Sequence, residues 1–354
     1  MTVAQNQSDP LNPWDIIVQI EPAIELALCV PCLFINVYFA LRFSKISTFN
    51  ANLKIVMILT NITTACIALL RPTLRFIPEK VYSVDGGNYV YACIVYFFFY
   101  LVQVFTLIMD SKYLIVGFER HIAFKNRADY EQRDTSETKK MLAIFILVIA
   151  VGTAIHNYYR VYTSKHSNWD QTLEYAFITE RSIISFFMLH VIAGIGWMVG
   201  AITFYQLKIA TKQNKYSGKS LSESYQIREI SRIVEVLGPL ILAYLSALVF
   251  CSICLSVLCY QVYFNDRHVK SSLYLGIANA EYISLNVYNI YGIAYMLWKF
   301  KQLRQMLYQD VCFFIRIKTP SIVEPVYIDR QLELEDHFRM LSTHWDTAMT
   351  ARNK

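Results

Sequence analysis

The stretch Tyr89–Ala123, YVYACIVYFFFYLVQVFTLIMDSKYLIVGFERHIA, decides the fold that this sequence predicts. It begins as an apolar, aromatic run and ends in the charged cluster Glu119-Arg120-His121. A helix needs about 20 mainly apolar residues to cross the hydrocarbon core of a bilayer. The stretch therefore predicts a membrane helix that carries charged groups at one end.

Composition supports a membrane protein. Of the 354 residues, 55% are hydrophobic and only 17% are charged, whereas soluble domains have roughly 25% charged residues. The surplus apolar surface must face lipid. The net charge of +6 comes from basic residues scattered over loops, so we expect a lipid bilayer and no nucleic acid as partner.

Seven segments are long and apolar enough to cross, and together they predict an all-α integral membrane bundle of seven transmembrane helices. The segments are residues 18–41, 53–70, 89–118, 141–158, 182–205, 236–260 and 273–298. This partition predicts an extracellular N-terminus (1–17), a membrane domain (18–298) and a cytoplasmic tail (299–354).

The distribution of Lys and Arg predicts the orientation. Basic residues concentrate in cytoplasmic loops. With the N-terminus outside, the outer segments hold 8 of them and the inner loops hold 15 before the tail is counted. The sequon Asn6-Gln7-Ser8 agrees, because only an outside or lumenal N-terminus is glycosylated. We therefore expect the N-terminus outside, a glycan on Asn6 and the C-terminus inside.

The start of the tail predicts a further helix. Residues 299–307, KFKQLRQML, are basic and amphipathic, as in a helix that lies on the inner leaflet. Cys312 follows, either as a palmitoylation site or as a free juxtamembrane thiol.

The charged end of the third segment has two interpretations. Arg120 at a helix end can snorkel to the interface while Glu119 neutralises it. Alternatively, Glu119, Arg120 and His121 form an ionic switch, with Arg120 restrained at rest and then released to meet a cytoplasmic partner. Asp110 and Lys112 face either the bundle interior or, as we expect slightly more, the inner end of the helix, where the lipid core has ended.

A ligand pocket is predicted from the depth at which polar and aromatic residues lie along the helices. Counted inward from the outer helix ends, Tyr96, Tyr100, His190, Glu281 and Glu25 lie at similar levels. Polar groups in an apolar, aromatic cavity suit a small-molecule site. The alternative is that His190 and Glu281 only satisfy each other or backbone groups.

Enzyme motifs are absent. There is no HExxH or GxSxG motif, and Gly218-Lys219-Ser220 lacks the first glycine of a phosphate loop. Cys251 and Cys254 form a CxxC inside an apolar run, where small packing residues are the expected interpretation. We expect no enzyme activity, no cofactor and no metal.

Short motifs resemble those of nematode serpentine chemoreceptors, in particular class epsilon. They are ERHIA (119–123), DYE (129–131), SESYQIRE (222–229), NVYN (286–289), WKF (298–300) and, in the tail, EDHFRML (335–341) with Trp345. The resemblance implies a seven-helix G-protein-coupled receptor for small chemicals that lies in the plasma membrane, in sensory neuron cilia among other places. Unlike rhodopsin-like receptors, the chain has no cysteine in residues 159–181 to pair with Cys93.

Two other classes compete with a receptor. A ligand-gated channel like the insect odorant receptors also has seven spans, but its N-terminus is inside, so mapping the Asn6 glycan discriminates the two. A small-molecule transporter ranks last, because no internal half-repeat with broken helices is visible.

Overall fold

The computed structural model describes residues 13–46, 49–127, 135–214, 221–265 and 271–315, and every element within these ranges is helical. The all-α prediction is thus confirmed for this part of the chain. The long helices are α1 (Pro13–Phe43), α2 (Ala51–Arg75), α3 (Tyr89–Asp110), α4 (Lys112–Lys125), α5 (Thr135–Thr163), α7 (Ile183–Gln213), α8 (Leu221–Tyr263) and α9 (Ser272–Lys299). Each of the seven predicted segments falls within these helices, the third being divided between α3 and α4.

The shorter elements are η1 (Glu79–Val81), α6 (Trp169–Phe177), η3 (Thr179–Arg181) and α10 (Lys301–Phe314). The chain divides into two units after Phe300. The first contains α1 to α9. Within the second, the structure describes α10, which confirms a helix at the start of the tail and extends it beyond residue 307.

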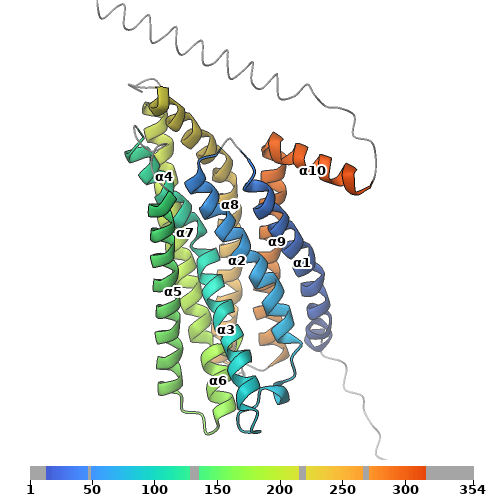
Figure 1. The fold of residues 1–354 in the computed structure, drawn as a ribbon. Coiled ribbons are helices and arrows are strands. Elements are labelled where there is room, and N and C mark those ends of the chain that lie inside the picture. Colours follow the sequence, from blue (N-terminus) through green and yellow to red (C-terminus); the bar gives the residue numbers. More distant parts are fainter. Residues whose placement is uncertain (1–12, 47–48, 128–134, 215–220, 266–270, 316–354) are drawn as a thin grey trace, which may run out of the picture. The chain divides into compact units, whose positions relative to one another are not determined.

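The first unit is a bundle whose long helices run roughly side by side (Figure 1). The elements η1, α6 and η3 gather at one end, called here the α6 end. The C-terminus of α4 and the start of α8 lie at the opposite end, called here the α4 end. Helix α1 packs on α2 and α9, α8 packs between α7 and α9, and α4 packs on α7.

The third predicted segment is interrupted at Ser111, where α3 ends and α4 begins. Helix α7 approaches this point closely through Gly196 and Gly200. A Cβ atom on Gly200 would lie 2.9 Å from the backbone carbon of Tyr113. The spacing of four residues puts both glycines on one face of α7, the small-residue pattern that lets membrane helices touch backbone to backbone.

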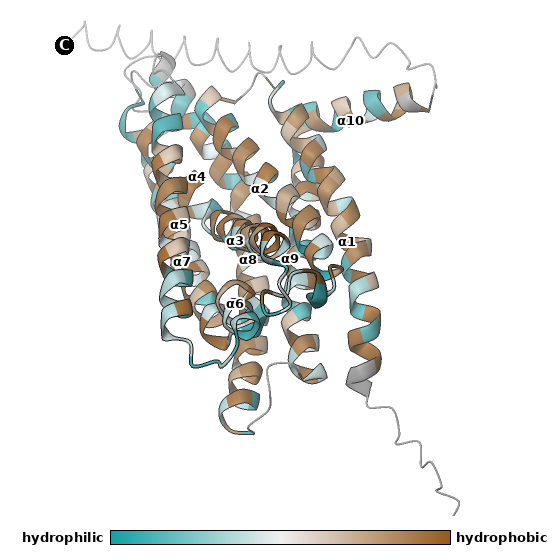
Figure 2. Cartoon of the chain, turned by 60° about the horizontal axis from the view of Figure 1, so that its bottom comes forward, coloured by the Kyte–Doolittle hydropathy of each residue, from teal (hydrophilic) through white to brown (hydrophobic). Residues whose placement is uncertain are grey.

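The outward faces are apolar, as a membrane environment requires. On α5, exposed hydrophobic side chains recur one turn apart at Ile144, Val148, Val151 and Ile155. Figure 2 shows hydrophobic residues along the helices and hydrophilic residues gathered towards their ends. Six described helices are long and apolar enough to cross a membrane, and α9 is not among them.

Asp110 and Lys112 lie in the bundle interior, so their expected position at the inner end of the helix is wrong. The hydroxyl of Tyr244 on α8 donates a hydrogen bond to Asp110 at 2.7 Å. Lys112 Nζ lies 3.4 Å from Asn289 Oδ1 on α9 and 4.2 Å from the centre of the Tyr288 ring. Counting apolar residues misplaced the pair, because α8 and α9 supply polar partners for charges at this depth.

Candidate functional site

A narrow cavity, about 20 Å³ of which is accessible to a water-sized sphere, lies among α1, α2, α3 and α9. It is called here the Arg71 cavity. Its apolar lining includes Ile67, Met109 and Tyr282, and its polar lining includes Arg71 and Asn286. A few polar groups in an apolar wall are typical of small-molecule sites.

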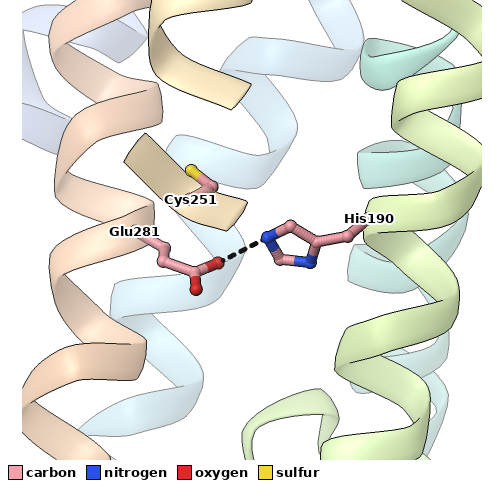
Figure 3. A group of neighbouring side chains, drawn as sticks. All are labelled: His190, Cys251 and Glu281. Atoms are coloured by element: carbon pink, nitrogen blue, oxygen red, sulfur yellow. Dashed lines mark ion pairs between the residues drawn. The ribbon is translucent and has the colours of Figure 1, made fainter. Parts of the chain in front are cut away.

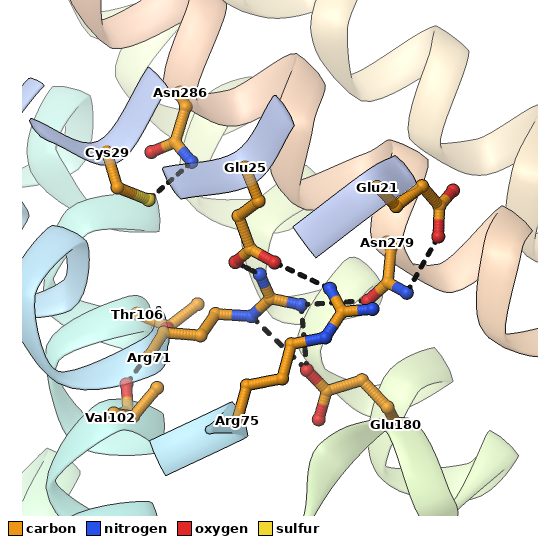
Figure 4. Close-up of polar contacts among 10 residues, drawn as sticks. All are labelled: Glu21, Glu25, Cys29, Arg71, Arg75, Val102, Thr106, Glu180, Asn279 and Asn286. Carbon is orange, nitrogen blue, oxygen red and sulfur yellow. Dashed lines mark hydrogen bonds and ion pairs between the residues drawn. The ribbon is translucent and has the colours of Figure 1, made fainter. Parts of the chain in front are cut away.

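Arg71 is the centre of a buried ionic network (Figure 4). Its guanidinium forms an ion pair with Glu25 of α1 and another, at 3.0 Å, with Glu180 of η3. It also donates to Asn279 of α9 at 3.3 Å and stacks on Tyr282, whose ring centre lies 3.4 Å from Cζ. One side chain of α2 thus joins α1, η3 and α9.

A second arginine completes this network one helical turn along α2. Arg75 pairs with the other oxygen of Glu25 at 2.7 Å, so that carboxylate bridges two guanidinium groups. Glu21, one turn before Glu25, accepts a hydrogen bond from Asn279 at 3.0 Å. Residues four apart lie on one helix face, which explains why two acidic residues of α1 meet two basic residues of α2.

Hydrogen bonds join the two connections at the α6 end, α2–α3 and α5–α7, to each other. Asn168 caps α6 by accepting from the Gln171 amide at 2.9 Å. Asp170, in the first turn of α6, accepts from the Ser83 hydroxyl at 2.5 Å and the Val84 amide at 2.6 Å. Tyr82 lies under this loop, and burial, with Glu79 nearby, raises its pKa to about 12. The two connections at the α6 end therefore form one hydrogen-bonded cap.

Two asparagines of α9 present weakly bonded amides to the cavity. Asn286 Nδ2 donates to the sulfur of Cys29 at 3.3 Å, and Asn289 Nδ2 donates to the sulfur of Met109 at 3.5 Å. Thiol and thioether sulfurs are weak acceptors. An oxygen atom of a ligand would therefore be a better partner for both amides.

The structure brings only Glu25 of the five predicted pocket residues to this cavity. Tyr96 packs against Tyr82 and Phe177 beneath the cap. The hydroxyl of Tyr100 donates to the Ala150 carbonyl of α5 at 2.8 Å.

The other two predicted pocket residues meet each other. His190 Nε2 lies 2.9 Å from Glu281 Oε2, with Cys251 beside the pair (Figure 3). Side chains at a similar depth on different helices need not point towards the same site, because each helix is rotated differently about its own axis.

Arg120 lies in a second ionic site near the α4 end. It is fully buried and holds Glu119 in a two-pronged contact of 2.5 and 2.6 Å. Its Nη1 lies 3.4 Å from Glu229 of α8, which also accepts from the Asn50 amide at 3.1 Å. The site thus joins α4 to α8 and to the start of α2.

A second ion pair joins α8 to the residues that follow the C-terminus of α4, seven residues after Arg120. Arg127 pairs with Glu223. Because the two helices run in opposite directions, residues 120 and 127 meet residues 229 and 223 in reverse order. We call these two contacts the α4–α8 bridges.

The remaining predicted site residues lie apart from both ionic sites. His121 is exposed on α4, although Glu119 and Arg120 before it are buried. Cys312 is a free thiol on α10. The sequon at Asn6 and the tail motif 335–341 lie outside the described residues.

Sequence reasoning missed Arg71 and Glu229 as functional residues. For Arg71 a signal existed, because Glu21 and Glu25 repeat at the same one-turn spacing as Arg71 and Arg75. For Glu229 none existed, since several acidic residues precede the apolar part of the sixth segment and nothing in the sequence marks which of them faces Arg120.

A comparison with known protein families gives a match that covers almost the whole helix bundle. The family described as "Serpentine type 7TM GPCR receptor class ab chemoreceptor" matches residues 16–319. No curated protein matches the sequence. The resemblance to serpentine chemoreceptors is therefore confirmed, but the matched class is ab rather than epsilon. The motifs behind the class epsilon prediction are each only three to eight residues long, too short to separate related classes.

Proposed function

Because this chain belongs to the class ab family of serpentine seven-transmembrane GPCR chemoreceptors, we propose that it detects a small organic molecule in the Arg71 cavity and signals to a cytoplasmic heterotrimeric G protein. The observation that carries the ligand site is the Arg71 cavity itself, with two weakly bonded asparagine amides in its wall. The family is one of receptors, which agrees with the expectation that the chain is not an enzyme.

In this proposal α9 is the seventh span and the α6 end faces outward. Helix α9 has 28 residues, enough to cross a bilayer. Its polar residues lower its hydropathy, but Asn279, Glu281, Asn286 and Asn289 are buried in the bundle. The excess of Lys and Arg in the loops of the opposite end supports an inward α4 end. The match to a chemoreceptor family supports a place in the plasma membrane, including that of sensory cilia.

The ligand is a small molecule with a carbonyl or carboxylate group. Its oxygens accept from the Asn286 and Asn289 amides, which now point at sulfur. Its apolar part lies against Ile67 and Leu285. Arg71, already between two carboxylates, orients a ligand carboxylate when one of these contacts opens.

Asn289 offers a route from the ligand to the switch. Its Oδ1 accepts from Lys112, in the first turn of α4, while its amide borders the cavity. Arg120 lies about two turns further along the same helix. A ligand that engages Asn289 changes this contact and favours the arrangement in which the α4–α8 bridges separate. Such a shift requires only that the ligand prefers one state.

A G-protein reporter assay in cells tests the ligand site. A panel of small carbonyl compounds and carboxylic acids is screened first, and the best agonist is then applied to Asn289→Leu. Loss of one buried hydrogen bond of about 1–1.5 kcal/mol predicts a rise in the half-maximal concentration of about five- to tenfold.

Asn61→Leu is the matched control. Asn61 is also buried, but its amide donates to the Met57 carbonyl of its own helix, away from the cavity. At equal surface expression, an unchanged response of Asn289→Leu contradicts the proposed ligand site. A ligand-gated current without G-protein activation would favour the channel alternative.

A further inference from the structure

His190, Cys251 and Glu281 converge from three different helices on one point in the bundle (Figure 3). His190 comes from α7, Cys251 from α8 and Glu281 from α9. One imidazole nitrogen, the thiol sulfur and one carboxylate oxygen all lie within 4.8 Å of one another. None of the three lines the Arg71 cavity.

The histidine is already oriented as metal-binding histidines are. His190 Nδ1 lies 2.8 Å from the Phe186 carbonyl oxygen. A carbonyl oxygen only accepts, so Nδ1 carries the proton and Nε2 points at Glu281 and Cys251. A backbone carbonyl on the far nitrogen is the usual outer contact that fixes the ring of a metal ligand.

The carboxylate has an unused oxygen. Glu281 Oε2 is 2.9 Å from His190, while Oε1 is buried and has no hydrogen-bond partner among the described residues. Buried polar atoms are normally satisfied. Cys251 is buried as well, with Ser284 Oγ 3.5 Å from its sulfur.

From this geometry we infer that His190, Cys251 and Glu281 bind one Zn²⁺ ion, with a fourth position left for water or a donor atom of a small molecule. Nitrogen, thiolate and carboxylate ligands together suit Zn²⁺ and exclude the hard ions Ca²⁺ and Mg²⁺. Ligand atoms around tetrahedral Zn²⁺ lie about 3.3–3.6 Å apart. The three ligand atoms now lie within 4.8 Å of one another, and side-chain rotations bring them to that separation.

Binding replaces the hydrogen bond between His190 and Glu281 with two bonds to the metal. The proton in the hydrogen bond between His190 Nε2 and Glu281 Oε2 and the thiol proton of Cys251 leave to solvent as Zn²⁺ enters, as for other thiolate and imidazole sites. The ion then fastens α7, α8 and α9 to one another. The CxxC pattern alone predicted no such site, because two of the three ligands lie on other helices and Cys254 takes no part.

Zn²⁺ titration of the purified full-length receptor in lipid nanodiscs tests this inference. The expected result is one Zn²⁺ per chain by competition with a fluorescent chelator, without competition from Ca²⁺ or Mg²⁺. Cys251→Ser and Glu281→Gln are each expected to weaken Zn²⁺ affinity by about tenfold or more. Cys254→Ser, one turn away on the same helix, should bind Zn²⁺ as the unchanged protein does.

Co²⁺ substitution gives a readout that does not depend on any variant. Co²⁺ bound by a thiolate shows a sulfur-to-metal charge-transfer band, which should appear in the unchanged protein and vanish in Cys251→Ser. Unchanged protein that binds no Zn²⁺, binds Co²⁺ without that band, or binds Ca²⁺ equally well overturns the inference. Because metal binding is measured directly, failure here leaves the proposed receptor function standing, and the reverse also holds.

Discussion

Arg71 and Arg120 are both buried arginines between two carboxylates, yet they connect the bundle differently. Arg71 takes its partners from α1 and η3, with Asn279 of α9 as a third contact. Arg120 takes its tightest partner from the adjacent residue, Glu119, and reaches α8 through a longer contact with Glu229. Arg71 is therefore built into the fold, whereas Arg120 keeps a neutralising partner when α4 moves.

The difference bears on the cost of movement. Pulling α2 away from α1 strands two guanidinium groups and a carboxylate in the bundle interior, which is expensive. Separating α4 from α8 gives up the 3.4 Å contact with Glu229 and the partly exposed pair of Arg127 with Glu223, and it leaves the pair with Glu119 intact. The α4 end is thus the cheaper place to open the bundle.

The largest effect is expected from removing the carboxylate charge that both arginines of α2 share. Glu25→Gln leaves Arg71 and Arg75 without their common partner. Breaking a buried ion pair costs about 3–5 kcal/mol, so thermal unfolding of the purified receptor should occur at a clearly lower temperature, with reduced surface expression.

Glu79→Gln serves as the control, because Glu79 pairs with Arg181 while its side chain is 55% exposed. Its unfolding temperature should hardly change. Equal stability of the Glu25 and Glu79 variants would remove the claim that Arg71 is built into the fold.

An intermediate effect is expected at the other arginine. Glu229→Gln weakens the contact of α8 with Arg120 while Glu119 keeps Arg120 neutralised. A loss of about 1–2 kcal/mol from the resting state raises the fraction of open receptors about five- to thirtyfold. Ligand-independent G-protein activation in the reporter assay, at matched surface expression, measures this change.

Glu235→Gln removes a carboxylate from the same helix without touching α4 and should leave basal activation unaltered. If Glu229→Gln also leaves basal activation unaltered, the contact between Arg120 and Glu229 is only structural, and the two arginines do not differ as described above.

The smallest effect is expected for the second α4–α8 bridge, the ion pair of Arg127 with Glu223. Arg127 and Glu223 are 28% and 9% exposed, and partly exposed pairs contribute at most about 1 kcal/mol. Arg127→Glu should raise basal activation by less than Glu229→Gln does. The double variant Arg127→Glu with Glu223→Arg should restore it, and failure of that rescue would show that the pair does not couple the helices.

Much of the architecture was predictable from local pattern. The seven segments lie within the observed helices, α8 begins at Leu221, well before its apolar part, and a helix opens the tail. These features follow from apolar length and amphipathic spacing, which are properties of contiguous residues. Helix α6 was not predicted, because its nine residues lie in a polar connection.

The candidate site was predictable only where its residues are adjacent in sequence. Glu119-Arg120 is visible as a pair at the end of an apolar run. The five predicted pocket residues share a depth, but only the pair of His190 and Glu281 proved to meet, and only Glu25 reaches the Arg71 cavity. Depth follows from counting along a helix, whereas direction depends on how each helix is rotated against its neighbours.

The sequence by itself therefore determined the fold class, the extent of the helices and the serpentine receptor family, because each depends on composition and contiguous pattern. Only the tertiary structure decided that Arg71 joins three other elements, that Asp110 lies inside the bundle and that Cys251 faces His190 and Glu281 rather than Cys254. These pairings join residues far apart in the chain. They depend on how each helix is rotated about its axis and on how closely it approaches its neighbours, as α7 does at Gly200, and no single segment encodes either property.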